Sequence, residues 1–141
     1  MRFLGIDPGD KRIGVAVSDL TGSIANPLKV IQHVSRPVDA YTIAMLAAEH
    51  GVEMIVVGQA LDENNEAGPS ARKANRLAEA IRSVSPIPVV LWDESGSTQA
   101  ARQAGIDLNV SRKKRRGHQD DLAATVILQT YLDRQAPYYP D

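Results

Sequence analysis

The stretch from Phe3 to Asp19, FLGIDPGDKRIGVAVSD, constrains the fold more than any other part of the chain. An apolar run from Phe3 to Ile6 ends in Asp7, a Pro-Gly turn follows, and a second apolar run covers Ile13 to Val17. Two apolar runs joined by a tight turn indicate a β-hairpin. Asp7 is unusual there, because aspartate is depleted in strands and an ionised side chain buried alone is costly. A metal cation is one partner that would explain its position.

Size and composition indicate a single globular domain over residues 1–141. A chain of 141 residues can bury roughly two thirds of its unfolded surface, and 43% hydrophobic with 23% charged residues is ordinary usage. The absence of cysteine excludes disulfides and Cys-ligated zinc or iron–sulfur centres. We see no signal peptide and no apolar run of the roughly 18 residues that a membrane span needs. We therefore expect a cytoplasmic protein.

The hydrophobic pattern predicts an α/β fold with a mixed five-stranded sheet and helices on both faces. A third strand at Leu28–Ile31 would complete a three-strand antiparallel meander with the hairpin. Two buried parallel strands are predicted at Glu53–Gly58 and Val89–Trp92. Right-handed crossovers would place these strands beside the meander. Sites in such sheets form at the carboxyl ends of the strands.

Helices are predicted over four stretches: Val38–His50, Ser70–Ser83, Ser97–Ala104 and Gln119–Leu132. The second is strongly amphipathic, with an apolar face formed by Ala71, Ala74, Leu77, Ala78 and Ile81. Gln59 to Pro69 is predicted to be an ordered loop or a lid, and residues 105–117 to be irregular. The tail at 137–141 is predicted to fray.

Two strand ends carry carboxylates. Asp7 ends the first strand, and Asp93 and Glu94 end the last. Strand alternation puts Asp93 and Glu94 on opposite faces, so only one of them can point at Asp7. If the first and fourth strands are neighbours, their carboxyl ends lie side by side.

The final predicted helix supplies a third carboxylate. Asp120 shares its stripe with Ala124, Ile127 and Tyr131, which is the face that would pack on the sheet. Asp121 lies about 100° away around the helix. Asp120 is therefore the better candidate for an inward carboxylate, although its neighbour leaves the third position ambiguous.

Clustered carboxylates repel one another, so one would stay protonated unless a cation lies between them. Mg²⁺ favours oxygen ligands, and two such ions about 3.5–4 Å apart can activate a water and stabilise the leaving oxygen of a phosphodiester. Each residue also has a simpler explanation. Asp7 could be a turn residue, Glu94 a solvated strand end, and Asp120 a helix-start charge. Their joint placement favours the metal site.

Basic residues gather around this predicted site, although the net charge is only −1. The cations that could bind a phosphate backbone are Lys11, Arg12, Arg72, Arg76 and the run Arg112, Lys113, Lys114, Arg115 and Arg116. A solvated charged loop is the simpler explanation of that run. Aromatic residues are scarce, which favours recognition of shape and backbone over base stacking. The histidines at 33, 50 and 118 are too scattered for a metal cluster, and His118 could assist proton transfer or be merely solvated.

These motifs together resemble the YqgF/RuvX family of Holliday-junction-resolvase-like pre-16S rRNA nucleases, which implies an RNase H-like fold. The resemblance covers essentially the whole chain. It rests on five stretches: GIDPGDKRIGVAVSD at 5–19, IVVG at 55–58, ARKANRLAEAI at 71–81, DESGST at 93–98 and DDLAATVILQTYL at 120–132.

The resemblance implies that Asp7, Glu94 and Asp120 form an acidic triad that is catalytic and binds Mg²⁺ or Mn²⁺, and it selects Glu94 over Asp93. The chain departs from the family pattern at Ser95, where arginine is usual, and at Gly96, where an apolar residue is usual. Gln59-Ala60 also replaces the usual Leu-Pro. These departures bear on substrate positioning and leave the triad intact.

The expected function is a divalent-metal-dependent nuclease that hydrolyses phosphodiester bonds at the 5′ end of pre-16S rRNA during ribosome biogenesis. One alternative is a Holliday junction resolvase acting on branched DNA, which must cut two strands symmetrically and is expected to dimerise. A second is a non-catalytic RNA-binding assembly protein. A sugar-kinase-like or actin-like ATPase needs two such domains, and 141 residues allow one. We expect a nucleic-acid partner, no membrane, and a monomer or weak homodimer.

Overall fold

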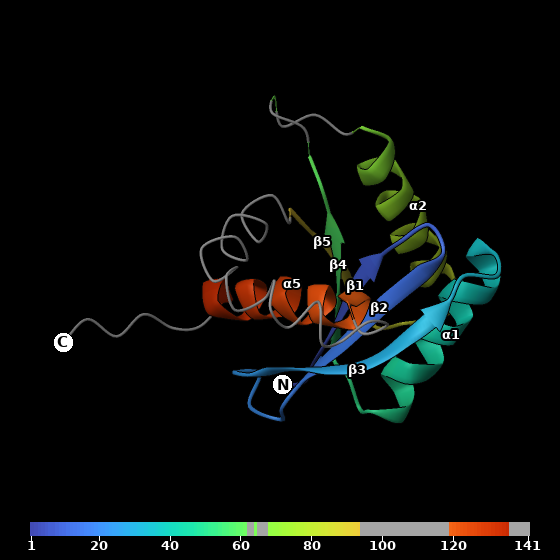
Figure 1. The fold of residues 1–141 in the computed structure, drawn as a ribbon. Helices are drawn as coiled ribbons and strands as arrows, with labels where there is room; N and C mark the ends of the chain where they lie inside the picture. The colour runs from blue at the N-terminus through green and yellow to red at the C-terminus, as the bar shows by residue number, and fades with distance from the viewer. Residues whose placement is uncertain (62–63, 65–67, 94–118, 136–141) are drawn as a thin grey trace.

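The computed structural model describes residues 1–61, 64, 68–93 and 119–135 (Figure 1). Its elements, in chain order, are β1 (Phe3–Pro8), β2 (Arg12–Ser18), β3 (Ala25–Gln32), α1 (Arg36–Glu49), β4 (Met54–Gln59), α2 (Pro69–Val84), β5 (Val89–Asp93) and α5 (Gln119–Gln135). The predicted helix at 97–104, the segment 105–117, the tail and most of the 59–69 loop lie outside the described residues.

The five strands form one sheet in the order β3-β2-β1-β4-β5. β1 pairs antiparallel with β2, and β2 with β3, which is the predicted meander. β4 pairs parallel with both β1 and β5. The predicted mixed sheet is therefore confirmed, and so is the neighbourhood of the first and fourth strands. β5 lies one strand further from β1.

β3 is longer than predicted. It begins at Ala25 rather than at Leu28, so it contains Pro27. Proline lacks the N–H that a ladder needs, but a strand at the edge of a sheet tolerates it. β3 is such an edge strand, and its register with β2 shifts between Val15 and Ala16. The prediction was wrong here because the sequence alone does not reveal which strand is at the edge.

α1 begins two residues before the predicted start at Val38. Ser35 is its N-cap, with a side chain that accepts a hydrogen bond from the Val38 N–H at 3.3 Å. Pro37 fits the first turn, where its missing N–H would have no helical partner. The apolar face predicted for α2 is confirmed, since all five of its residues are buried.

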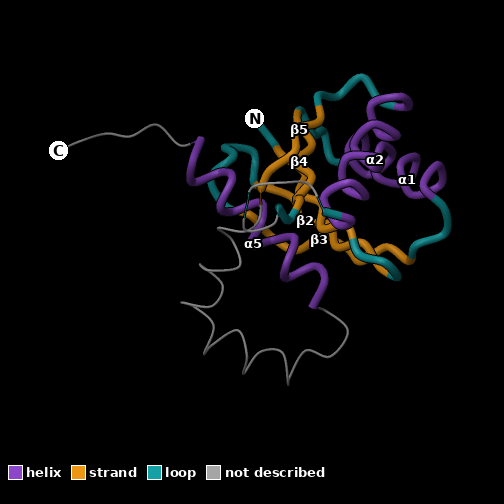
Figure 2. The backbone as a smooth tube through the Cα atoms, turned by 90° about the horizontal axis from the view of Figure 1, so that it is seen from above, coloured by secondary structure: helices purple, strands orange, loops and turns teal. Residues whose placement is uncertain are grey.

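The helices cover both faces of the sheet, as predicted. α1 and α2 lie side by side on one face and α5 lies on the other (Figure 2). Two hydrophobic clusters result. The larger, under α1 and α2, includes Leu4, Ile6, Ile43, Ile55 and Ile81. The smaller, under α5, includes Phe3, Ala16, Val56, Ala124 and Leu128. Within the described part of the chain, no helix has both the length and the apolar character required to cross a membrane.

Candidate nuclease site

Asp7 lies near the carboxyl end of β1, half-buried and opposite Gly14 of β2. Strand alternation puts it on the same face as Phe3 and Gly5. Phe3 belongs to the cluster under α5, and a Cβ added to Gly5 would lie 2.6 Å from the Cβ of Leu128. Asp7 therefore lies on the α5 face of the sheet. Only on this face could its carboxylate lie close to the start of that helix.

α5 runs over β1 in the opposite direction to the strand. Near the start of β1, the rings of Phe3 and Tyr131 lie with their centroids 5.8 Å apart. Two residues further along the strand, a Cβ on Gly5 would lie 3.2 Å from the Ala124 carbonyl oxygen. The first turn of α5, which contains Asp120, therefore continues toward the Asp7 end of β1.

The inward stripe predicted for α5 is confirmed. Ala124, Ile127 and Tyr131 are 0%, 3% and 8% exposed, and Leu128 is also buried. The backbone of Asp120 lies one helical turn before Ala124 on this stripe. The side chains of Asp120 and Asp121 lie outside the described part of the structure.

The packing of β5 shows on which face of the sheet Asp93 lies. Val90 and Trp92 pack in the α5 cluster, whereas Val89 and Leu91 pack against the α1 and α2 cluster. Alternation then places Asp93 on the face opposite to that of Asp7. Glu94 lies outside the described residues, so its role stays a prediction. Asp93 is a poorer candidate than Glu94 for this position, because it lies on the face opposite to that of Asp7.

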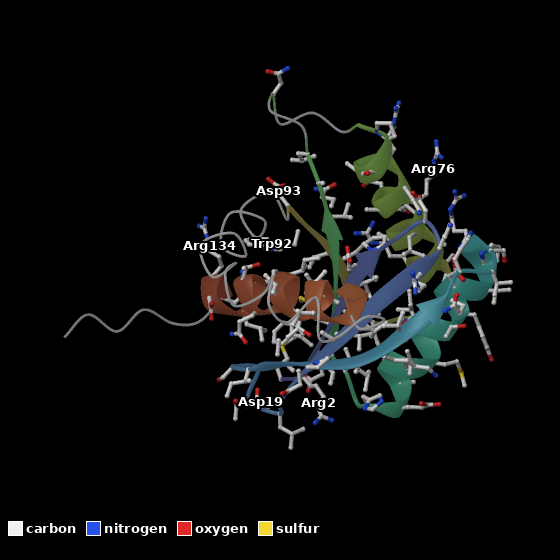
Figure 3. The ribbon with its side chains drawn as sticks, in the orientation of Figure 1. Arg2, Asp19, Arg76, Trp92, Asp93 and Arg134 are labelled. Atoms are coloured by element: carbon white, nitrogen blue, oxygen red, sulfur yellow. The ribbon has the colours of Figure 1, made fainter. Side chains whose placement is uncertain are left out.

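Trp92 joins the end of β5 to α5. Its Nε1 donates a hydrogen bond to Thr130 Oγ1 at 3.0 Å, and its ring meets Tyr131 edge-on with centroids 5.4 Å apart. Figure 3 shows Trp92 beside Asp93 at the end of the strand. This contact holds the carboxyl end of β5 in position relative to the helix.

The predicted basic residues of the hairpin turn lie beside α2. Lys11 lies in the turn between β1 and β2, Arg12 is the first residue of β2, and both are exposed. Lys73 of α2 donates from Nζ to the Gly9 carbonyl oxygen at 2.7 Å and to Asp10 Oδ1 at 2.6 Å. The hydrogen bond and the charge of Lys73 hold the pKa of Asp10 below its ordinary value.

That contact brings the first turns of α2 to the hairpin turn. Arg72 and Arg76 are exposed on this helix, and Figure 3 shows Arg76 on its outer side. The structure therefore brings four predicted phosphate-binding residues to one region: Lys11, Arg12, Arg72 and Arg76. The run from Arg112 to Arg116 lies outside the described residues.

Sequence reasoning missed one further pair at this end of the sheet. Asp39 is only 2% exposed, and its carboxylate accepts hydrogen bonds from His33 Nδ1 at 2.5 Å and from the Val34 N–H at 3.0 Å. Ser35 and Pro37 mark a helix start, and an acid in the first turn is usual there. That signal could have placed Asp39 in a first turn, but not its burial or its pairing with His33.

Within the described residues, no group of three or more His, Asp or Glu side chains could hold a metal ion. Two of the three predicted ligands, Glu94 and Asp120, lack a described side chain, so the triad stays a prediction. The predicted donors are all carboxylate oxygens. This donor set fits the hard cations Mg²⁺ and Mn²⁺ and does not fit soft, thiolate-seeking metals.

Sequence comparison relates nearly the whole chain to known proteins. A family model described as RuvX, Holliday junction resolvase, matches residues 1–134. A relative from Thermoanaerobacter pseudethanolicus named "Putative pre-16S rRNA nuclease" is 43% identical over 136 residues, covering 96% of this chain and 98% of the relative. A relative of the same name from Geobacillus kaustophilus is 47% identical over 136 residues, covering 94% and 98%.

Structural comparison identifies the fold. The RuvC protein of Thermus thermophilus, solved in complex with a Holliday junction substrate, matches with a TM-score of 0.62 at 19% identity over 96% of each chain. The large terminase nuclease of the thermophilic phage G20c matches with a TM-score of 0.59 at 13% identity, over 92% of this chain and 81% of that one. These likenesses confirm the RNase H-like fold.

Proposed function

The chain belongs to the RuvX family, and from this premise we propose that it is a divalent-metal-dependent nuclease that hydrolyses phosphodiester bonds in the 5′ region of pre-16S rRNA. The observation that carries the proposal is the sequence identity of 43% and 47%, over nearly the full length, to relatives named for that activity. The placement of Asp7 on the α5 face, at the carboxyl end of a central strand, supports it. Ribosome maturation in the cytoplasm is the corresponding setting.

Asp7, Glu94 and Asp120 are the proposed catalytic triad and the ligands of Mg²⁺ or Mn²⁺. Two features of the fold support this choice. Asp93 lies on the other face of β5, and the stripe that leads back from Ala124 along α5 passes through Asp120 rather than Asp121. When bound, a divalent cation neutralises charge on the phosphate and lowers the pKa of a bound water.

The rest of the site holds the substrate. Lys11, Arg12, Arg72 and Arg76, together with Arg112, Lys113, Lys114, Arg115 and Arg116, are proposed to bind backbone phosphates. Such contacts fix the position of a nucleic acid without reading its bases. Salt should therefore weaken binding steeply, because each neutralised phosphate releases counterions.

Replacing Asp7 with Asn tests the mechanism. We expect Asp7→Asn to abolish Mg²⁺- and Mn²⁺-dependent cleavage of a 5′ pre-16S rRNA fragment, because the amide is a poor metal ligand, while RNA binding in EDTA survives. Asp93→Asn is the matched control, a strand-end carboxylate on the opposite face, and it should retain cleavage. Full cleavage by Asp7→Asn in a nuclease-free preparation would contradict the mechanism.

A resolvase acting on branched DNA is the second candidate, because the matching family is described as a Holliday junction resolvase. The chemistry would be the same, but symmetric cutting of two strands requires a dimer. A monomer or weak homodimer fits the rRNA substrate better. Cleavage of a four-way junction and of the pre-rRNA fragment, assayed side by side with the mass in solution, separates the two. Binding without cleavage of either would indicate an assembly protein.

A further inference from the structure

His33 and Asp39 form a pair that the proposed chemistry does not use. A carboxylate only accepts hydrogen bonds, so the 2.5 Å contact with Asp39 Oδ2 requires the hydrogen on His33 Nδ1. Asp39 is buried and held by the Val34 N–H as well, whereas the His33 side chain is 40% exposed. The ring is therefore fixed in orientation by a partner beneath it.

The pair lies beside the basic hairpin turn. The His33 N–H donates to the Lys11 carbonyl oxygen at 2.9 Å, and the preceding residue, Gln32, pairs with Arg12 across the β2–β3 ladder. His33, Lys11 and Arg12 thus come from two adjacent strand ends and lie at one edge of the sheet.

A purely structural role for His33 explains the hydrogen bond of Nδ1 but not the position of Nε2. Closing the start of α1 requires a donor at Nδ1, which bonds to Asp39, and it places no demand on Nε2. Among the described residues, Nε2 has no hydrogen-bond or ion-pair partner. In a protonated ring this atom carries a second N–H donor.

We propose that His33 Nε2 contacts a backbone phosphate of the bound nucleic acid, next to the phosphates held by Lys11 and Arg12. Asp39 is the positioning residue, because it orients the ring through Nδ1. The inference rests on the proposed function and extends its binding surface from the hairpin turn to the end of β3. It is a binding role, in which no bond is made or broken.

Two substitutions divide the ring by atom. In His33→Asn the side-chain amide nitrogen replaces Nδ1 and can still donate to Asp39, but Nε2 is lost. In His33→Gln the amide nitrogen falls near the position of Nε2, and the bond to Asp39 is lost. His50→Asn, at the C-cap of α1, is the matched control.

Binding is measured by fluorescence anisotropy in the non-cleaving Asp7→Asn protein, with EDTA present and no metal. The probes are a single-stranded 5′ pre-16S rRNA fragment and a four-way DNA junction. The buffer is set at about pH 6, within the range in which histidines change charge, and salt is varied from about 50 to 200 mM. The melting temperature of each variant is recorded in parallel.

We expect His33→Asn to weaken binding roughly 3- to 10-fold at unchanged melting temperature, as loss of one charge-assisted hydrogen bond implies. The slope of log affinity against log salt should become shallower by about 0.7 on the single strand or about 0.9 on the duplex arms. His50→Asn should match the parent. The probe that shows the loss identifies the nucleic acid that reaches His33.

Equal affinity and salt slope in His33→Asn and the parent would overturn the inference, as would a parent that binds neither probe. If His33→Asn lowers the melting temperature, His33→Gln decides, because it loses the bond to Asp39 but keeps a donor near the position of Nε2. Tighter binding by His33→Gln than by His33→Asn supports the inference, and binding no tighter than that of His33→Asn overturns it. The two proposals can fail separately. If the wild type cleaves neither probe, but His33→Asn still binds more weakly than its parent, the nuclease proposal is refuted and the proposed role of His33 stands.

Discussion

The two faces of the sheet are packed on different principles. Under α1 and α2 lie large aliphatic side chains, with Leu4, Ile6 and Ile43 each 0% exposed. Under α5 large side chains such as Phe3 are also buried, but at Gly5 and Ala124 the helix approaches the strand closely because both residues are small. The first face contributes most of the buried apolar volume, whereas the second depends on the closeness of the fit.

This difference matters because Asp7 and the first turn of α5 belong to the second face. A cavity among aliphatic side chains lowers stability but leaves the strands in place, since their ladders persist. A methyl group between β1 and α5 has no space, so the helix must move. Stability and site geometry should therefore respond to substitutions on opposite faces of the same strand.

The largest expected loss of stability is for Leu4→Ala. Removing this fully buried side chain should lower the free energy of unfolding by about 2–5 kcal/mol through lost burial and a residual cavity. Urea denaturation measures the loss. Cleavage assayed at a temperature where the variant is fully folded should equal that of the wild type, and a folded but inactive Leu4→Ala would break the comparison.

Gly5→Ala, at the next residue, should act on the site instead. The new Cβ would lie 2.6 Å from the Leu128 Cβ and 3.2 Å from the Ala124 carbonyl oxygen, so α5 must shift. We expect a stability cost of about 1–3 kcal/mol and a fall in cleavage on the order of 100-fold, since small displacements of catalytic groups are costly.

Gly68→Ala serves as the control for that substitution, because no atom of the described residues lies within 4 Å of a Cβ placed there. Its cleavage rate and melting temperature should be close to those of the wild type. Wild-type cleavage by a stable Gly5→Ala would show that the approach of α5 does not position the site.

The smallest effect is expected at the β2–β3 hairpin, at the far end of the sheet from Arg76 and Asp93 (Figure 3). α5 is joined to this hairpin by two hydrogen bonds of Gln129, whose side chain accepts from the Ala25 N–H and donates to the Ser23 carbonyl oxygen. Within the hairpin, hydrogen bonds from Thr21, Ser23 and Ile24 hold the pKa of Asp19 below its ordinary value of 3.8.

A depressed folded-state pKa stabilises the protein above the unfolded value and ceases to do so as pH falls through the folded value. The wild type should therefore lose slightly more thermal stability than Asp19→Asn between about pH 5 and pH 3. Melting curves across this range measure the difference. An Asp19→Asn curve parallel to that of the wild type would rule out this contribution.

Local patterns were sufficient to predict most of the secondary structure. The period of apolar residues located α2 and its buried face, and short β-rich runs located the strands. The start of α1 was also readable, from Ser35 and Pro37, but the prediction overlooked these signals. The start of β3 was not readable, because whether Pro27 is tolerated depends on the neighbours of its strand.

Some features of the candidate site could likewise be predicted from local sequence, and others could not. Asp7 could be selected from the sequence, since a carboxylate at the end of an apolar strand is conspicuous. The contact between Lys73 and the hairpin turn joins residues 64 positions apart, and no local signal predicts it. His33 is close to Asp39 in sequence, yet their pairing needs β3 and α1 to meet at a fixed angle.

The sequence by itself therefore determined the family and most of the described elements, and it predicted the three carboxylates, because periodicity and residue chemistry are local properties. Only the tertiary structure decided on which face each side chain lies: that Asp93 is turned away from Asp7, that α5 runs back toward the end of β1, and that Lys73 and His33 flank the basic turn. These outcomes depend on strand order and on the direction in which a helix crosses the sheet, which are set by packing between residues distant along the chain.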